Sequence, residues 1–308
     1  MFPANARMHL DRYVNTLGRH LTARFGERVR KLALHAGFTC PNRDGTLGHG
    51  GCTFCSVRSF NASDAEIPVR EQLAARRAEL TRASRFMAYF QAYTNTYAEV
   101  EELGRLYAEA TREADIVGLC VGTRPDCVPD AVLALLADYR RRGYEVWLEL
   151  GLQSAHDETL QRIQRGHGFA AYADVVARAH RHGVPVCTHL ILGLPGETGD
   201  MCRETHRRVL ELGVGGIKLH PLMIVKGSAM AAQYARGELQ APLIGDYAAI
   251  AAELIRRTPP EIVFHRVTAT AREPTLIAPD WCHTSWPAIH AICADLIRNG
   301  GQGCAARQ

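Results

Sequence analysis

Three cysteines with an uncommon spacing are the residues of this chain best suited to metal or redox chemistry. Cys40, Cys52 and Cys55 lie in the glycine-rich stretch TCPNRDGTLGHGGCTFCSVRSF with the spacing C-x11-C-x2-C. Thiolate sulfur is a ligand for zinc and for iron–sulfur clusters, and both kinds of structural site usually have four protein ligands. The question that the sequence raises is what completes a set of three.

Four kinds of site are compatible with these thiols. A structural zinc site would need His35 or His49 as its fourth ligand, whereas a catalytic zinc would keep that position open. A thioredoxin-like dithiol at Cys52 and Cys55 would need a helix that starts at the pair, and the glycine-rich approach disfavours one. An iron–sulfur cluster held at three irons would leave the fourth iron open for a substrate or cofactor.

Alternating strand and helix patterns surround the cysteine loop. Near-continuous apolar runs, typical of buried parallel strands, occupy residues 29–37, 86–93, 116–122, 145–153, 185–193 and 215–222. Amphipathic helical patterns lie between them, and three end at Gly143, Gly183 or Gly213, which suit a left-handed C-cap. Six successive βα units predict an α/β fold whose parallel sheet is covered by helices and is either curled or open.

The expected organisation is a single domain in three parts. Residues 1–28 form an N-terminal helical extension, residues 29–258 form the α/β core, and residues 259–308 form a strand, a loop and a helix packed on the same domain. Polar motifs follow the first five strands: the cysteine loop, TNT, TRPD, QS and GLPGET. Since ligands bind where parallel strands end, these motifs are expected to face one mouth.

Composition and charge bear on the expected cellular compartment and on possible partners. The chain has 308 residues, ten cysteines, a net charge of +4 and 33 arginines against three lysines. Because no apolar run reaches the roughly 18–20 residues that span a bilayer and the N-terminus lacks a signal pattern, a cytoplasmic protein is expected. Cytoplasmic thiols stay reduced, which argues against a disulfide framework. Arginine clusters at 70–85 and 139–144 fit either solvated helix faces or a phosphate-binding surface.

Several longer phrases together resemble one family. They are GFTCPNRDGTLGHGGCTFC, YFQAYTNTYA, GTRPDC, LELGLQSAHDETLQRIQRGH, CTHLILGLPGET and KLHPLMIVKGS. With them the chain resembles the radical S-adenosylmethionine (SAM) superfamily over about residues 10–297, and most closely its YhcC-type branch, which has this cysteine spacing. The resemblance implies an enzyme with a partial (β/α)6 radical SAM barrel and a C-terminal strand-loop-helix extension.

The resemblance also implies two cofactors. It places a [4Fe–4S] cluster on Cys40, Cys52 and Cys55, with the methionine part of SAM on the open iron. An electron from a reductant protein such as flavodoxin or ferredoxin then cleaves SAM to methionine and a 5′-deoxyadenosyl radical. The cofactor supplies this chemistry, and the protein supplies position and the exclusion of water.

The resemblance also implies which residues of this chain bind SAM, because they match motifs of the family. Phe54 matches an aromatic residue near the adenine, and Gln153 and Ser154 match a contact to the ribose. Arg165 matches an arginine that pairs with the SAM carboxylate, although it could instead be a surface charge of a helix. The amino-group motif and the turn that passes the adenine comprise Thr94, Asn95, Thr96, Gly193, Leu194, Pro195 and Gly196. Thr96 could alternatively be a helix N-cap.

Four residues are candidates for catalysis: Glu149, Cys127, Tyr93 and Lys218. Glu149 lies four residues before Gln153 and so shares its face of the strand, where a buried glutamate needs a partner. Contact with SAM or substrate is preferred there over a structural ion pair. Cys127 and Tyr93 are candidate hydrogen donors. Substrate contacts near the mouth are expected from Lys218, Lys226, His189 and His220, although the two histidines could instead be satisfied core residues.

The substrate is less determined than the radical chemistry. The coproporphyrinogen-oxidase-like and Elongator-like relatives carry an acid where this chain has Gly122, so their way of holding the SAM amino group is not carried over. The YhcC-type resemblance implies a role on the wobble uridine of tRNA, where the radical would start removal of a carboxymethyl arm and leave an aminomethyl uridine. The alternatives are a radical SAM enzyme for a small metabolite or a protein, and a zinc-stapled binding protein.

Overall fold

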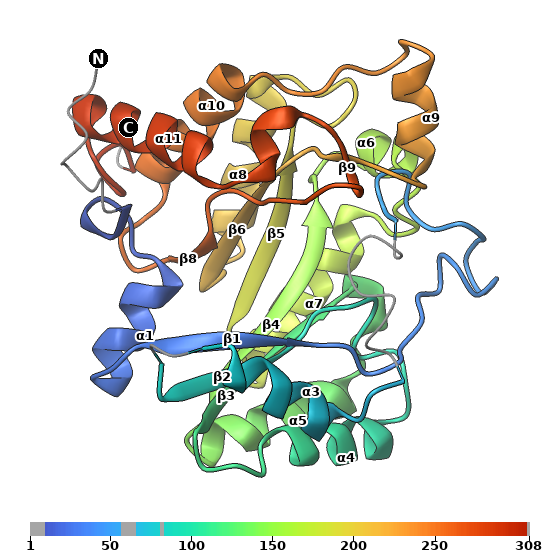
Figure 1. Ribbon diagram of the computed structural model, residues 1–308, viewed down its shortest axis with the longest axis vertical. Coiled ribbons are helices and arrows are strands. Elements are labelled where there is room, and N and C mark those ends of the chain that lie inside the picture. Colours follow the sequence, from blue (N-terminus) through green and yellow to red (C-terminus); the bar gives the residue numbers. More distant parts are fainter. Residues whose placement is uncertain (1–9, 57–65, 81–82, 307–308) are drawn as a thin grey trace.

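A curled parallel sheet forms the centre of the computed structural model, which describes residues 10–56, 66–80 and 83–306 (Figure 1). The strands lie side by side in the order β1-β2-β3-β4-β5-β6-β8, and each neighbouring pair is parallel. Their bounds are Val29–Leu34 (β1), Arg85–Phe90 (β2), Ile116–Thr123 (β3), Glu145–Gln153 (β4), Val186–Leu192 (β5), Gly216–Pro221 (β6) and Val263–Arg266 (β8). The predicted partial barrel is confirmed, and β8 adds a seventh strand to it.

Two strands end three residues earlier than the sequence predicted, for local reasons. The first ends at Leu34 because the backbone N–H of His35 donates to the side chain of Gln72 (2.9 Å) instead of to a strand. The second ends at Phe90, and Tyr93 beyond it has a positive φ of 64°, which no extended strand accommodates. Because both strands end early, residues 35–37 and 91–93 belong to the loops at the carboxyl end of the sheet.

Helices cover the outer face of the sheet, as the amphipathic patterns predicted (Figure 1). They are α3 (Val69–Ala78), α4 (Val100–Ala110), α5 (Asp130–Arg141), α6 (Asp157–Arg162), α7 (Phe169–Arg181), α8 (Gly199–Glu211) and α10 (Ile244–Arg257). Gly143, Gly183 and Gly213 follow α5, α7 and α8 with positive φ, which confirms the expected left-handed caps. None of the described helices is long and apolar enough to cross a membrane.

The C-terminal extension is a strand, a loop and a helix, as expected. After β8 the chain forms β9 (Leu276–Ala278), which pairs antiparallel with the short strand β7 (Ile224–Val225), and then α11 (Trp286–Asn299). Helix α11 packs along α10 (Figure 1). The domain boundaries at 28 and 258 stay a prediction.

The N-terminal helix closes the amino end of the barrel. In α1 (Leu17–Phe25), Leu17 and Leu21 are buried against inward-facing residues at the start of the strands, among them Met87, Trp147 and Val263. The backbone N–H of Phe264 donates to the carbonyl of Asn15 (2.8 Å), so the segment before α1 also pairs with β8. An apolar floor therefore lies beneath the polar interior of the barrel.

Candidate active site

A cavity of about 420 Å³ occupies the carboxyl end of the barrel. Four of the five predicted strand-end motifs contribute to its lining: the cysteine loop, TNT through Thr94, TRPD through Arg124, and QS through Gln153. The fifth, GLPGET, lies beside it, since Leu194 belongs to the apolar cluster against which Phe54 packs. Cavities of this size accommodate a small ligand or cofactor.

The cysteine loop presents all three thiols to the cavity. Cys40, Cys52 and Cys55 are free thiols that line it. The side-chain amide of Asn42 and the guanidinium of Arg165 approach the sulfur of Cys52 at 3.4 and 3.5 Å, and N–H donors of this kind stabilise a cluster-bound sulfur. Cys52 and Cys55 lie in a turn, so the described residues 52–56 do not form the helix that a thioredoxin-like dithiol requires. Three thiols fit three irons of a [4Fe–4S] cluster.

The described residues of the TNT and TRPD motifs include buried polar atoms without a hydrogen-bond partner. Among the described residues, Thr94 Oγ1, Asn95 Oδ1 and Arg124 Nη1 are buried with no hydrogen bond to protein. Leaving such an atom unpaired costs about 1–3 kcal/mol, so a polar ligand beside them is favoured. Thr94 and Arg124 line the cavity. Their chemistry fits SAM, whose amino and carboxylate groups supply donors and acceptors.

The TNT motif is held by β3. The side-chain amide of Asn95 donates to the carbonyl of Gly122 (2.7 Å). The hydroxyl of Thr96 bonds to that of Thr123 (2.6 Å) and also to the backbone carbonyl of Cys127. Since the N-cap of α4 is Glu99, the alternative interpretation of Thr96 as that cap is wrong.

The end of β4 brings the QS motif and Arg165 together. Gln153 lines the cavity with a positive φ of 80°, an uncommon conformation for a non-glycine residue that is often found at functional sites. The hydroxyl of Ser154 donates to Glu197. Arg165 is only 6% exposed and donates twice to the carbonyl of Gly151 (3.1 and 2.6 Å), so it is not a surface charge.

Some of the remaining predicted residues line the cavity, and others do not. Phe54 and Tyr93 line it. The fifth-strand turn of Gly193, Leu194, Pro195 and Gly196 lies outside the lining, with Leu194 buried and the carbonyl of Pro195 accepting from Arg162 (2.7 Å). Cys127 is also outside it, and burial together with the charge of Asp126 raises the pKa of its thiol to about 12. Neither is Lys226 among the lining residues.

A layer of ion pairs crosses the barrel and forms part of the cavity lining through Glu149, Lys218 and His189. Glu149 is fully buried, and both of its oxygens are occupied. One oxygen accepts from Lys31 and lies 2.9 Å from His265 Nδ1, and the other lies 3.1 Å from Lys218 Nζ and 2.9 Å from His189 Nε2. Burial opposes ionisation of Glu149, but the two ammonium charges and the two imidazole hydrogen bonds hold its pKa well below the usual range.

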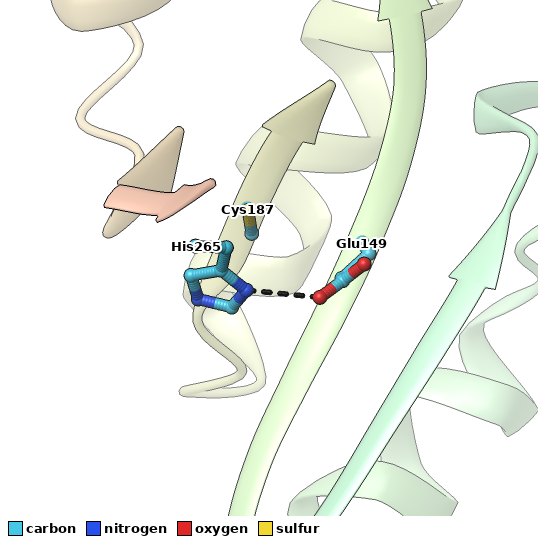
Figure 2. Close-up of side chains that lie close together, drawn as sticks. All are labelled: Glu149, Cys187 and His265. Atoms are coloured by element: carbon cyan, nitrogen blue, oxygen red, sulfur yellow. Dashed lines mark hydrogen bonds and ion pairs between the residues drawn. The ribbon is translucent and has the colours of Figure 1, made fainter. Parts of the chain in front are cut away.

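The same layer contains three potential metal-ligating groups. Glu149, Cys187 and His265 place one ligating atom each within 4.8 Å of one another (Figure 2). Two ammonium groups already neutralise the carboxylate, however, and burial raises the pKa of the Cys187 thiol well above its ordinary value. An ion-pair network is therefore favoured over a metal site. Glu149 also lines the cavity, so its predicted role beside SAM or substrate stays a prediction.

Sequence reasoning did not single out several residues of the site. Lys31 holds Glu149, Asn42 contacts Cys52, and Arg124 and Arg266 line the cavity. Two signals could have pointed to Lys31 as an inward-facing residue. The period-two pattern of VRKLAL puts it on the same face as the small Ala33, and lysine is scarce in this chain. Arg266 ends a strand that had been assigned to the extension, so its side chain was not expected in the barrel.

Comparison with known proteins agrees with this geometry. A family model described as the radical SAM superfamily matches residues 40–209, and one described as the Radical_SAM C-terminal domain matches residues 214–298. Protein YhcC from Escherichia coli (strain K12) is 54% identical over 299 residues, which cover 97% of each chain. A tRNA uridine(34) acetyltransferase from Dehalococcoides mccartyi is 28% identical over 160 residues, or 51% of this chain and 34% of that protein.

A solved structure shares the fold. The archaeal Elp3 from Methanocaldococcus infernus superposes with a TM-score of 0.65 at 17% identity, covering 89% of this chain and 64% of that one. At this identity the likeness establishes the architecture alone. Together with the family matches and the three thiols at the cavity, it identifies the chain as a member of the radical SAM superfamily, whose members are enzymes that bind a [4Fe–4S] cluster and SAM.

Proposed function

We propose that this enzyme acts on tRNA, where the 5′-deoxyadenosyl radical would take a hydrogen atom from the carboxymethyl arm of a carboxymethylaminomethyl wobble uridine, to give 5′-deoxyadenosine, and so start the conversion of this uridine to the aminomethyl form. The observation that supports the reaction type is the cavity in which three thiols meet the SAM motifs. The similarity to a tRNA uridine(34) acetyltransferase supports the substrate. That match covers about a third of the relative, and acetyl transfer is not part of the proposal.

The residues of this chain would bind, orient and shield the cofactors. Cys40, Cys52 and Cys55 would hold the cluster, which when bound supplies the electron that cleaves SAM. Arg165, already fixed by the carbonyl of Gly151 and the sulfur of Cys52, would direct its remaining N–H donors toward the SAM carboxylate. The unpartnered atoms of Thr94 and Asn95 would receive the amino group, and Gln153 and Ser154 would contact the ribose. Phe54 would pack against the adenine. The turn of Gly193, Leu194 and Pro195 would pass the adenine beside it.

Among the candidate catalytic residues, those that line the cavity are best placed. Tyr93 lies beside the cysteine loop and would donate hydrogen to a substrate radical. Lys218 donates to Tyr89 (2.7 Å), and burial lowers its pKa to about 8, so it would exchange a proton near neutral pH. Cys127 lies outside the lining and is the weaker candidate as a hydrogen donor.

The arginine clusters contribute little to the tRNA interpretation. Arg141 and Arg142 both pair with Asp138 on the exposed face of α5, which supports the solvated-face alternative for residues 139–144. The cluster at 70–85 extends over residues 81–82, which lie outside the described ranges. The salt dependence of tRNA binding measures how many phosphates the protein contacts.

The test is an anaerobic assay on tRNA. The protein is purified without oxygen, reconstituted with iron and sulfide, and supplied with dithionite, SAM and tRNA that carries unprocessed carboxymethylaminomethyl uridine. We expect 5′-deoxyadenosine to form while mass spectrometry of the nucleosides shows this uridine converted to the aminomethyl form. If 5′-deoxyadenosine forms and the tRNA nucleosides do not change, the substrate is a metabolite or a protein. A flavodoxin or ferredoxin should replace dithionite.

Arg165→Gln should weaken SAM binding about tenfold or more while the cluster stays intact. The substitution removes a charge-assisted bond to the SAM carboxylate, worth about 1.5–3 kcal/mol. Equilibrium binding of SAM and iron content are measured on the reconstituted protein, with Arg298→Gln on the exposed face of α11 as the matched control. Unchanged SAM affinity would assign Arg165 to support of the cysteine loop alone.

A further inference from the structure

A group of basic side chains on the last two strands of the sheet takes no part in the sites assigned above to the cluster and SAM. Lys218 and His220 lie on β6, and Arg266 ends β8, where it is the register partner of Lys218. Residues two apart on a strand share a face, and all three line the cavity. We call these three residues the basic wall. In the same cavity the cysteine loop follows β1, at the other end of the strand order, and Arg165 contacts β4 in the middle of it.

The basic wall carries more positive charge than its surroundings neutralise. Glu149 is the one acidic residue among the described residues that line the cavity, and Lys31 and Lys218 already share its carboxylate. Within the described ranges, no acidic side chain forms an ion pair with Arg266. Arg266 is half-buried, and a cation partly removed from water without a counter-ion is unfavourable, so an anion beside it is favoured.

His220 adds a hydrogen-bond donor of the right kind. Its Nε2 atom is buried and has no hydrogen-bond partner in the described part of the chain. Burial and the charges of Arg266 and Lys218 hold its pKa well below the ordinary value, so the imidazole is neutral and carries one N–H. Its ring stacks on that of His189, with centroids 6.1 Å apart, which fixes its orientation.

We propose that the basic wall binds a carboxylate of the substrate, with Arg266 as its principal partner and Lys218 and His220 as further donors. This inference rests on the proposed function, under which the carboxylate is that of the carboxymethyl arm. A guanidinium matches a carboxylate with two parallel hydrogen bonds. The other lining arginines are engaged: Arg124 with Asp126, Arg165 with Gly151, and Arg43 with the carbonyl of Cys55.

The experiment compares an acid with its ester on the reconstituted holoenzyme. The probes are the nucleoside 5-carboxymethylaminomethyluridine and its methyl ester, which has the same arm without the negative charge. Equilibrium dialysis with SAM present gives the affinity for each. The wild type should bind the acid about 10- to 100-fold more tightly than the ester, and Arg266→Gln should remove this preference. Arg266→Lys should keep part of it, and Arg298→Gln should keep all of it.

The outcomes separate this inference from the function on which it rests. Equal affinity for acid and ester in the wild type, including no binding of either, would overturn the carboxylate site. A preference that persists in Arg266→Gln would overturn it too. SAM affinity is measured on the same variants, and a loss of SAM binding equal to the loss of acid binding would assign the wall to SAM. Conversion of the tRNA nucleoside is scored separately and decides the proposed function by itself.

Discussion

Replacing any one of Cys40, Cys52 or Cys55 with alanine will abolish SAM cleavage while the barrel stays folded. Each thiol lines the cavity, and each substitution would leave the cluster with only two of its three protein ligands. Their loop follows β1 and is not part of the sheet, so the buried core keeps its packing. The measurement is iron content, the visible spectrum and 5′-deoxyadenosine formation after anaerobic reconstitution, with circular dichroism to report folding.

The chain offers a control for this experiment. Cys304 is an exposed free thiol near the end of the chain, and Cys304→Ala should leave about four irons per chain and normal SAM cleavage. SAM cleavage that persists in any of the three loop variants would remove that cysteine from the ligand set. Zinc in place of iron, with no cleavage under any reductant, would contradict the ligand assignment for all three.

Glu149→Gln will destabilise the protein by about 3–5 kcal/mol, because it leaves two buried ammonium groups without their counter-ion. The amide keeps the size of the side chain, so lost packing contributes little. Lys31 and Lys218 are held by this carboxylate alone among the described acidic residues. Urea unfolding at neutral pH measures the loss, and Glu238→Gln, which breaks an exposed pair with Arg236, is the control that should change stability little.

A second substitution tests the cause of this loss. Adding Lys31→Met to Glu149→Gln removes one of the two uncompensated charges and should recover part of the stability. If the double variant is less stable than Glu149→Gln, or if Glu149→Gln unfolds like the exposed control, then charge compensation is not what Glu149 provides. Activity of the variants would separately report whether the carboxylate also contacts SAM or substrate.

The sequence predicted the order of strands and helices well because the apolar runs and glycine caps are local features. The fourth strand was predicted with the bounds that the structure has, and the strand-end motifs were predicted to converge. The partners of Glu149 could not be predicted in this way. Period-two alternation shows which face a residue occupies, but not the register of strands that are far apart in sequence. Lys31 lies 118 residues before Glu149, and His265 lies 116 residues after it.

The same distinction applies to the binding residues: those in local motifs could be predicted, and those placed by the pairing of distant strands could not. Motif resemblance led to Arg165, and the structure adds that its guanidinium is buried beside Cys52. Arg266 was missed because residues 259–308 were treated as an extension, whereas β8 pairs with β6 and brings this arginine opposite Lys218. The strand itself was predicted, but its place in the main sheet could not be inferred from VFHR, which has only two apolar residues and no helix pattern directly after it.

The closure of the barrel floor has a consequence for joining this enzyme to other molecules. The side chain of Gln302 accepts from the backbone of Asn15 (2.7 Å) and donates to the carbonyls of Pro259 and Ile262 (2.8 Å each), just before β8 begins. Both described ends of the chain therefore meet at the amino end of the sheet, away from the cavity. A fluorescent reporter or an immobilising group attached to the exposed thiol of Cys304, which lies two residues after Gln302, should leave the path of a large RNA to the cavity clear.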